Sequence, residues 1–436
     1  MTVAETAKQA RAASRSMASL TIASRDQALI AMADALLNAR DRLFDANNRD
    51  LANAHGLPEP VRKRLIYNEK KLRESVDELR ALAAAPDPLG RTTLARMLAD
   101  GLKLYRVSCP IGVVGVIFES RPDALVQIAA LCLKSGNAAL LKGGSEASYT
   151  NRALFEALNA AAISCGIPEG WASLFGSRED VAEMLALDDL IDLIIPRGGN
   201  AFVRYIKENS RIPVLGHADG VCHVYVDVSE RGENDRRAPY ADCALRVVRD
   251  SKTQYAAVCN AVETLLVHKD AAEAFLPELA KNMPEVELRG CPAAQRIINC
   301  KSASDADWDA EYLDYILSVR VVDSLDEAIE HINRHGSGHT DAIVTDSPLR
   351  AARFLAEADS ANVFHNCSTR FADGYRYGFG AELGIATGKI HARGPVGLEG
   401  LTIYKYKLLG AGHTVADTQD GTVAYLHKPL DEECPL

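Results

Sequence analysis

The sequence predicts an α/β protein with two domains, each built on a Rossmann-like parallel β-sheet, and a smaller element of strands. Short apolar runs rich in β-branched residues alternate with helical patterns between residues 112 and 200, and the same alternation returns between 260 and 345. Two strand-like runs within 91–112 and a single one at 401–410 lie outside these regions. Strands that alternate with helices at this spacing form parallel sheets covered by helices.

The first part of the chain is expected to be helical. Apolar residues recur at steps of three and four through 24–56 and 71–90, and these runs end at Gly56 and in a Pro/Gly turn. The two strand-like runs that follow are joined at Asp100-Gly101, a dipeptide typical of a hairpin turn.

The next region alternates regularly. Strands are expected at 111–119, 137–144, 171–177 and 191–199, with helices at 123–136, 145–166 and 178–187 between them. Sheets of this kind bind nucleotides beyond the carboxyl ends of their strands. Two strands end in a basic residue and a glycine pair: Lys142-Gly143-Gly144 and Arg197-Gly198-Gly199. Backbone amides and the positive end of a following helix favour an anion there, although a tight turn chosen for backbone geometry explains either pair alone.

A third strand of this region ends in Ser120 and Arg121, and Pro122 stands at the favoured first position of the next helix. Ser120 and Arg121 are therefore candidates for ligand binding at the sheet edge. A helix cap with a surface ion pair is the competing interpretation.

Composition excludes several classes of protein. The chain has 436 residues and a net charge of -10, whereas a nucleic-acid binder needs a basic surface. No apolar run is long enough to span a membrane, and residues 1–20 lack the apolar centre of a signal peptide. The ten cysteines form no CxxC pair and no cluster with zinc spacing, so we expect a cytoplasmic protein with reduced thiols and no metal.

The second alternating region contains Cys259 just before the apolar run 263–268, with small alanines and Asn260 beside it. Small neighbours leave room for a substrate carbon at the sulfur, and a thiol with a depressed pKa or a nearby base is a nucleophile. A buried cysteine that only fills the core is the competing interpretation. The local sequence does not decide between them.

A long segment after residue 365 is rich in glycine and polar residues and shows no periodicity. Long loops in compact enzymes are often functional. Its hydroxyl and guanidinium groups suit recognition of carboxylate or phosphate, and a solvated surface loop is the alternative. The polar residues of this loop are Asn366, Ser368, Thr369, Arg370, Arg376, Lys389 and Arg393, of which the first four are the candidates for substrate binding.

Four stretches, 114–147, 194–200, 251–268 and 368–407, resemble the γ-glutamyl phosphate reductase family of the aldehyde dehydrogenase superfamily. The resemblance runs over essentially the whole chain. It implies an aldehyde dehydrogenase-like fold with an NADPH-binding domain (1–87 and 109–238), a catalytic domain (239–394) and an oligomerisation element (88–108 and 395–436). Cys259 matches the catalytic cysteine, Lys142 a lysine on the adenosine ribose and its 2′-phosphate, Glu311 a glutamate on the nicotinamide ribose, and Asn366 an active-site asparagine.

The resemblance also implies a reaction. Cys259 would attack L-glutamyl 5-phosphate, and NADPH would reduce the thioester to L-glutamate 5-semialdehyde in proline biosynthesis. Ser120 stands where hydrolytic aldehyde dehydrogenases have an oxyanion-binding asparagine. The stretch 215–221 offers His217 and Asp219 where those enzymes have the glutamate that activates water. Without that base the thioester is protected from hydrolysis.

Two other functions remain open at this point. One is a hydrolytic NAD(P)-dependent aldehyde dehydrogenase, and the other is a non-catalytic metabolite-binding or scaffold protein on the same fold. The expected partners are a second copy of the chain, as a dimer or tetramer, and a separate glutamate 5-kinase in transient contact, because the chain contains no kinase domain.

Overall fold

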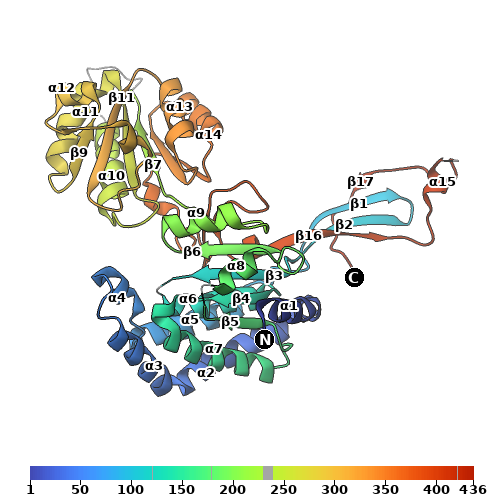
Figure 1. Ribbon diagram of the computed structural model, residues 1–436. Coiled ribbons are helices and arrows are strands. Elements are labelled where there is room, and N and C mark those ends of the chain that lie inside the picture. Colours follow the sequence, from blue (N-terminus) through green and yellow to red (C-terminus); the bar gives the residue numbers. More distant parts are fainter. Residues whose placement is uncertain (120, 178, 229–238, 420) are drawn as a thin grey trace. The chain divides into compact units, whose positions relative to one another are not determined.

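The computed structural model describes residues 1–119, 121–177, 179–228, 239–419 and 421–436, with no account of the side chains of 60 and 239–241. The chain forms two compact units (Figure 1). Unit 1 comprises Met1–Leu215, Phe379–Leu383 and Val396–Leu436, and unit 2 comprises Gly216–Gly378 and Gly384–Pro395. In the described part of the chain no helix combines the length and the apolar character needed to cross a membrane.

Unit 1 contains a four-stranded parallel sheet in the order β5-β4-β3-β6. Its strands are β3 (Val113–Phe118), β4 (Ala138–Lys142), β5 (Ala172–Phe175) and β6 (Leu193–Arg197). Every residue of β3 and β4 is buried, which explains why both strands are continuous apolar runs in the sequence.

Helices connect and cover this sheet. The helices between and after the strands are α6 (Pro122–Lys134), α7 (Ser148–Ser164), α8 (Glu179–Leu185) and α9 (Asn200–Asn209). The amino-terminal helices are α1 (Val3–Met17), α2 (Ile22–Asn38), α3 (Arg40–Asn53), α4 (Glu59–Leu65) and α5 (Glu69–Ala84). Helices α6 and α7 pack with α2 and α5, while α1 packs against β3, β4 and β5.

Unit 1 also carries an antiparallel sheet in the order β16-β2-β1-β17. Its strands are β1 (Thr92–Ala99), β2 (Leu102–Pro110), β16 (Thr402–Leu409) and β17 (Lys428–Pro429), and α15 (Val415–Gln419) lies between the last two. The predicted hairpin and the predicted tail strand are confirmed as partners in one sheet, since β2 pairs with β1 and β16. Gly101 takes a φ of +73° at the turn, a conformation that favours glycine.

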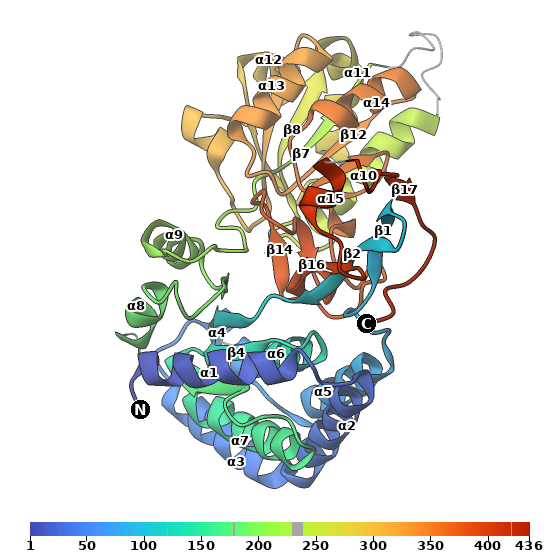
Figure 2. The same cartoon turned by 90° about the vertical axis from the view of Figure 1, so that its right-hand side faces the viewer.

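Unit 2 is built on a seven-stranded parallel sheet in the order β10-β9-β11-β8-β7-β12-β13. Its strands are β7 (Cys222–Val226), β8 (Val262–His268), β9 (Glu287–Gly290), β10 (Lys301–Ser302), β11 (Ile316–Val322), β12 (Thr340–Val344) and β13 (Asn362–His365). Its helices are α10 (Pro239–Thr253), α11 (Lys269–Asn282), α12 (Pro292–Ile297), α13 (Leu325–His335) and α14 (Pro348–Glu357), seen from a second side in Figure 2.

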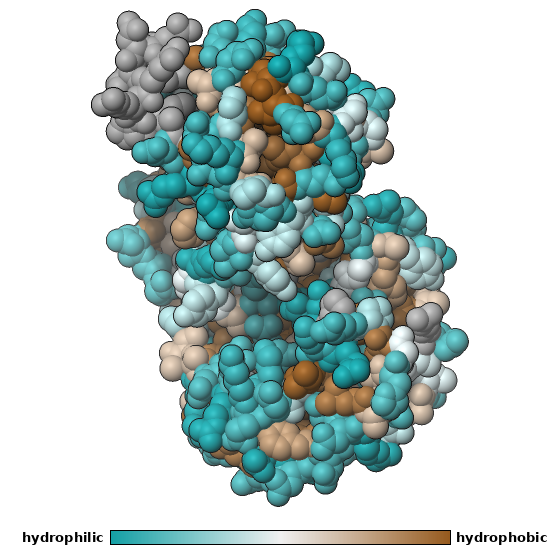
Figure 3. Space-filling model, turned by 90° about the vertical axis from the view of Figure 1, so that its left-hand side faces the viewer, coloured by the Kyte–Doolittle hydropathy of each residue, from teal (hydrophilic) through white to brown (hydrophobic). Residues whose placement is uncertain are grey.

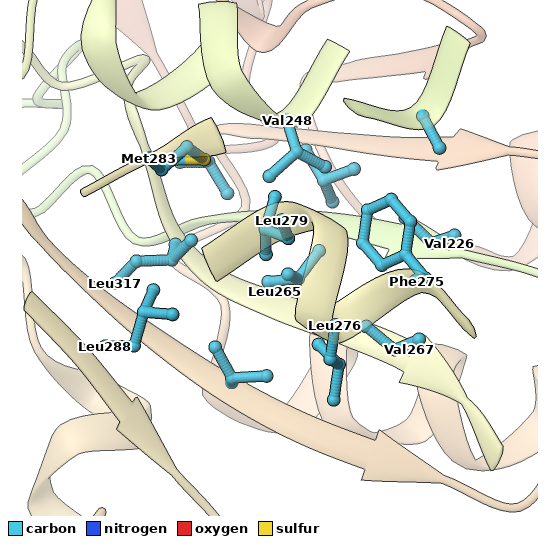
Figure 4. Close-up of a cluster of buried hydrophobic side chains, with 14 of the residues drawn as sticks. Val226, Val248, Leu265, Val267, Phe275, Leu276, Leu279, Met283, Leu288 and Leu317 are labelled. Carbon is cyan, nitrogen blue, oxygen red and sulfur yellow. The ribbon is translucent and has the colours of Figure 1, made fainter. Parts of the chain in front are cut away.

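Two apolar clusters hold the helices of unit 2 on the faces of its sheet. One joins α10, α11 and α12 to the sheet, and Figure 4 shows Phe275, Leu276 and Leu279 of α11 over Leu265 and Val267 of β8. The other joins α13 and α14 to the opposite face. Figure 3 shows that one side of the molecule is mostly hydrophilic, with apolar residues in small groups.

The structure differs from the sequence-based prediction in three places. The predicted helical run 24–56 is divided at Ala39 into α2 and α3. Ser145 begins a short 3-10 turn, Ser145–Ala147, and α7 starts at Ser148. Strand β7 belongs to the second sheet, between β8 and β12, so unit 2 begins at Gly216, whereas the sequence placed the domain boundary at 238. Strand pairing is non-local, and the short run of β7 does not indicate which sheet it joins.

Candidate active site

The first candidate site lies at the carboxyl edge of the sheet in unit 1. Strand β4 ends at Lys142 and passes into Gly143-Gly144, and β6 ends at Arg197 and passes into Gly198-Gly199. Both strands are neighbours of β3, so the two glycine pairs follow the same edge of one parallel sheet. This is the edge at which such sheets bind nucleotides.

The turn after β4 suits a nucleotide. Lys142 is only 7% exposed, and its Nζ donates to the carbonyl of Gly143 at 2.7 Å. A Cβ on Gly143 would lie 2.3 Å from Nδ2 of Asn151, so glycine at this position allows the side chain of Asn151 to pack closely against the turn. Asn151 is itself buried, and its Oδ1 has no hydrogen-bond partner within the described residues. The cation of Lys142 and the unpartnered acceptor of Asn151 together fit the phosphate and hydroxyl groups of a nucleotide.

The turn after β6 is organised differently. The amide of Gly199 donates to Oε2 of Glu119 at 2.9 Å, and a Cβ on Gly198 would lie 2.7 Å from the same oxygen. The carboxylate of Glu119 thus stands at the start of α9, where helix amides favour an anion. A ligand phosphate at this helix start competes with Glu119. The adjacent Ser120 lies outside the described residues, and Arg121 is exposed at the N-cap of α6.

The second candidate site surrounds Cys259 in unit 2. Cys259 lies in the turn between α10 and β8, just before the amino end of β8. Gly220 precedes β7 and His339 precedes β12, and the three strands are adjacent in the order β8-β7-β12. Residues far apart in the chain therefore meet at the amino edge of this sheet.

Two imidazoles stand beside the thiol. One ring nitrogen each of His217 and His339 and the Sγ of Cys259 all lie within 4.8 Å of one another. Nδ1 of His217 lies 2.6 Å from the carbonyl oxygen of Ile385, which only accepts hydrogen bonds. Nδ1 therefore carries a proton, and in the neutral ring Nε2 has a lone pair. His339 is fully buried, and burial holds its pKa well below the usual range, so it is neutral.

Sequence reasoning noted His217 only as a replacement for the hydrolytic glutamate and did not find His339. A single histidine before an apolar strand is an unremarkable pattern. Only the order of strands in the sheet places it near Cys259.

Hydrogen bonds attach the polar loop after residue 365 to the turn that carries Cys259 and to the preceding helix α10. Thr369 Oγ1 donates to the carbonyl of Asn260 at 2.7 Å, and Asn260 Nδ2 donates to the carbonyl of Ala372 at 2.8 Å. The hydroxyl of Ser251 contacts that of Ser368 at 3.2 Å. The hydroxyl groups of Ser368 and Thr369 therefore hold the loop on the turn.

Arg370 is the cation of this loop that interacts electrostatically with the thiol. It is 7% exposed, and its Nε donates to Oε1 of Gln254 at 2.9 Å. Burial lowers the pKa of Arg370, Arg376 lowers it further, and Cys259 acts in the opposite direction. A negative charge at Cys259 and the guanidinium thus stabilise each other.

Asn366 is anchored elsewhere. It adopts a left-handed φ of +56°, and its side chain both accepts from the amide and donates to the carbonyl of Thr345, at 3.0 Å each. Thr345 follows the carboxyl end of β12, whereas His339 precedes its amino end. These contacts assign Asn366 to the turn after β12 and do not bring it to the thiol. Glu311 precedes β11. Burial raises the pKa of Glu263 on β8, and the charge of Glu311 raises it slightly further.

A buried ion pair connects the two elements on either side of the turn that carries Cys259. Lys252 Nζ of α10 and Glu263 Oε2 of β8 lie 2.5 Å apart with both side chains fully buried. The other oxygen of Glu263 accepts from the amide of Leu313 at 3.3 Å. The pair joins the two elements between which the thiol-bearing turn lies.

Gly220 is a position at which we expect even a small side chain to disturb the site. A Cβ there would lie 2.2 Å from the carbonyl oxygen of Cys259 and 2.6 Å from its Cα, so Gly220→Ala must move the thiol or β7. Such overpacking costs about 1–3 kcal/mol. We expect lower thermal stability and slower alkylation of Cys259 by iodoacetamide. Gly176→Ala is the control, because within the described residues nothing lies within 4 Å of a Cβ at Gly176. Equal behaviour of the two variants would contradict the prediction.

Comparison with known proteins gives consistent matches. The model of the aldehyde dehydrogenase family matches residues 1–297. A γ-glutamyl phosphate reductase of Acetivibrio thermocellus is 54% identical over 440 residues, which cover 100% of both chains. One of Pelotomaculum thermopropionicum is 53% identical over 99% of both. The crystal structure of γ-glutamyl phosphate reductase from Thermotoga maritima superposes with a TM-score of 0.91 at 38% identity, covering 95% of this chain and 100% of that one.

Proposed function

Because the chain belongs to the aldehyde dehydrogenase family, and within it to the γ-glutamyl phosphate reductases, we propose that it reduces L-glutamyl 5-phosphate to L-glutamate 5-semialdehyde with NADPH, through a thioester on Cys259. The chain is thus an oxidoreductase of proline biosynthesis. The observation that supports the mechanism is that imidazole nitrogens lie within 4.8 Å of Sγ of Cys259, a thiol that also interacts electrostatically with the buried guanidinium of Arg370.

His217 is the proposed proton acceptor. Its Nδ1 proton is held by the carbonyl of Ile385, so Nε2 accepts the thiol proton of Cys259. Sγ then attacks the γ-acyl carbon, the bond from that carbon to the phosphate oxygen breaks, and phosphate leaves with the electron pair. A thioester results. Backbone amides around Cys259 are the proposed donors to the oxyanion.

Arg370 is the proposed ligand of the acyl phosphate. It is the buried cation that interacts with Cys259, and guanidinium groups bind phosphate with two parallel hydrogen bonds. Ser368 and Thr369 position the loop that carries it. For Ser120, Arg121 and Asn366 a role in substrate binding stays a prediction from the sequence, and for Asn366 the contacts with Thr345 point to a structural role.

The family implies a nicotinamide cofactor, and the residues of unit 1 fit one. Lys142, Gly143 and Asn151 would hold the adenosine half, and Gly198 and Gly199 would approach the pyrophosphate. A role of Glu311, a residue of unit 2, on the nicotinamide ribose stays a prediction from the sequence. When bound, NADPH supplies the hydride that reduces the thioester. The resulting thiohemiacetal loses its C–S bond, the aldehyde leaves, and the thiolate of Cys259 takes back the proton from His217.

The absence of a glutamate in 215–221 supports reduction over hydrolysis. Hydrolysis of the thioester would waste the activated acyl group, so a site without a base directed at water preserves it.

The reverse reaction tests the proposed function. With L-glutamate 5-semialdehyde and NADP, NADPH should appear only when phosphate is added, because phosphate is the acceptor of the acyl group. NADPH formation without phosphate, with glutamate as product, would identify a hydrolytic aldehyde dehydrogenase. Absence of any turnover, together with slow alkylation of Cys259 that substrate does not prevent, would favour a non-catalytic binding protein.

A variant of His217 tests the proton acceptor. His217→Gln should slow alkylation of Cys259 by iodoacetamide near pH 7 by about a hundredfold, because general base catalysis typically contributes at least this much. At higher pH the difference should shrink, since hydroxide removes the proton instead. The control His335→Gln, whose imidazole pairs with Asp309, should react like the wild type. A slow rate that stays slow at all pH values would indicate a structural effect and exclude His217 as the base.

Assembly is the remaining part of the proposal. Strand β16 is an edge strand among the described residues, and Tyr404, Tyr406 and Leu408 on it are exposed. Unpaired edges with apolar side chains favour pairing with another chain. We therefore place the contact between copies of the chain at the β16-β2-β1-β17 sheet, and we propose a cytoplasmic enzyme that receives its unstable acyl phosphate from a separate glutamate 5-kinase.

A further inference from the structure

The thiol of Cys259 and the two imidazoles beside it are three possible metal ligands. The proposed reaction uses only the thiol and one of the imidazoles. His217 serves as a base in that reaction, but His339 has no role in it. The three ligand atoms lie within 4.8 Å of one another, on three separate segments of unit 2. Thiolate and imidazole are the preferred ligands of Zn²⁺ and similar thiophilic cations.

His339 provides the second, independent observation. Its side chain is fully buried, and its Nε2 has no hydrogen-bond partner within the described residues. Its Nδ1 lies 2.8 Å from the hydroxyl of Thr340. A buried polar atom without a partner costs about 1–3 kcal/mol, and a metal bond to Nε2 removes this cost. A neutral imidazole is the form that binds metals.

His217 has the supporting contact that metal-binding histidines usually have. Its Nδ1 donates to the carbonyl of Ile385, which orients the ring and directs the lone pair of Nε2 away from that carbonyl. The two rings stand edge to face, with centroids 4.8 Å apart. A tetrahedral zinc site has ligand atoms about 3.3–3.8 Å apart, given bonds of about 2.0–2.3 Å. The three ligand atoms, which lie within 4.8 Å of one another, must approach by about 1 Å or more to reach this geometry.

We propose that His217, Cys259 and His339 bind a thiophilic divalent cation such as Zn²⁺, and that the bound cation reversibly blocks the nucleophilic sulfur. Three protein ligands leave a fourth position for water. Because the bound metal withdraws electron density from Sγ and its other ligands crowd the sulfur, metal binding slows the attack of Sγ on the acyl carbon. This site is non-local, which is why the search for zinc spacing along the sequence did not find it.

Cobalt(II) is a suitable probe, because its complexes with thiolates absorb light and those of zinc do not. Titration of the reduced full-length protein with Co²⁺ should produce a thiolate-to-cobalt absorption band in the near ultraviolet, together with the intense visible bands of four-coordinate cobalt. Addition of Zn²⁺ should abolish both. This readout does not depend on turnover, so it remains informative whether or not the proposed reaction occurs.

Variants assign the ligands. Cys259→Ser should remove the near-ultraviolet band, and His339→Gln should weaken Co²⁺ binding by at least about tenfold. Cys300→Ser and His335→Gln are matched controls in the same unit and should bind like the wild type. His217→Gln, at a half-buried position, is the second ligand variant if His339→Gln does not fold. A band that persists in Cys259→Ser, or equal weakening in the controls, would overturn the proposal, as would the absence of any band in the wild type.

Inhibition supplies an independent check. Micromolar Zn²⁺ should slow both alkylation of Cys259 and the reverse reaction, and a chelator should restore both. If Zn²⁺ binds but alkylation is unchanged, the metal lies elsewhere and the proposed block of the sulfur is excluded.

Discussion

Replacing Cys259 by alanine is expected to abolish the phosphate-dependent formation of NADPH from L-glutamate 5-semialdehyde and NADP. Without Sγ no thioester forms, and loss of a covalent nucleophile typically lowers kcat by more than about a thousandfold. Steady-state rates with saturating phosphate measure the effect.

The size of this loss depends on the variant leaving the fold intact. Cys259 is half-buried in a turn, and alanine is smaller than cysteine, so we expect an unchanged midpoint of thermal unfolding. Cys300→Ala serves as the control for removal of a thiol from unit 2 and should keep full activity. Normal turnover by Cys259→Ala would refute the covalent mechanism and leave the family assignment untouched.

The second large effect is expected at the ion pair of Lys252 and Glu263. Lys252→Met leaves the carboxylate of Glu263 buried without its cation, and breaking a buried pair from one side typically costs about 3–5 kcal/mol. Urea unfolding of the full chain measures the loss. Since the pair brackets the Cys259 turn, activity should fall together with stability.

The dependence on pH identifies the cause. Burial raises the pKa of Glu263 to about 7 even beside Lys252, so the folded chain keeps a proton that the unfolded chain has lost. The stabilisation that this retained proton provides is fully present at pH values below the usual carboxyl range. It is lost as the pH rises through about 7. The loss in free energy of unfolding of Lys252→Met relative to the wild type should therefore be smaller near pH 5.5 than near pH 8.5.

A double variant completes the test. Lys252→Met combined with Glu263→Leu removes both charges, and apolar replacement of a buried pair is often neutral or stabilising. The double variant should therefore regain most of the stability that the single variant loses. If it is as unstable as the single variant, packing around the two side chains, and not the unpaired charge, explains the loss.

Much of the fold could be predicted because it depends on local patterns. The residues Val113–Phe118 are uniformly apolar, as a strand buried on both faces requires, and β3 has these bounds. Asp100-Gly101 predicted the hairpin turn between β1 and β2, where Gly101 adopts a positive φ. The break at Ala39 was not predicted, because alanine favours helix and the apolar periodicity continues past it.

The candidate site was predictable only in part. Cys259 and the polar loop around Arg370 follow from residue type and from the family resemblance. His339 does not, because its neighbour Thr340 belongs to β12, and nothing in the sequence places β12 near β8. Asn366 shows the converse, since its position in the sequence suggested the active site and its contacts attach it to Thr345.

By itself the sequence determined the α/β class, most strands and helices of the first parallel sheet and the family, and it named Cys259 as the candidate nucleophile, since these depend on periodicity, turn chemistry and motifs within short stretches. Only the tertiary structure decided that β7 lies between β8 and β12 and that two imidazoles stand beside Cys259. The physical reason is that strand order in a parallel sheet is decided by packing between distant segments. That packing sets which residues share an edge of the sheet, and hence which groups the thiol meets.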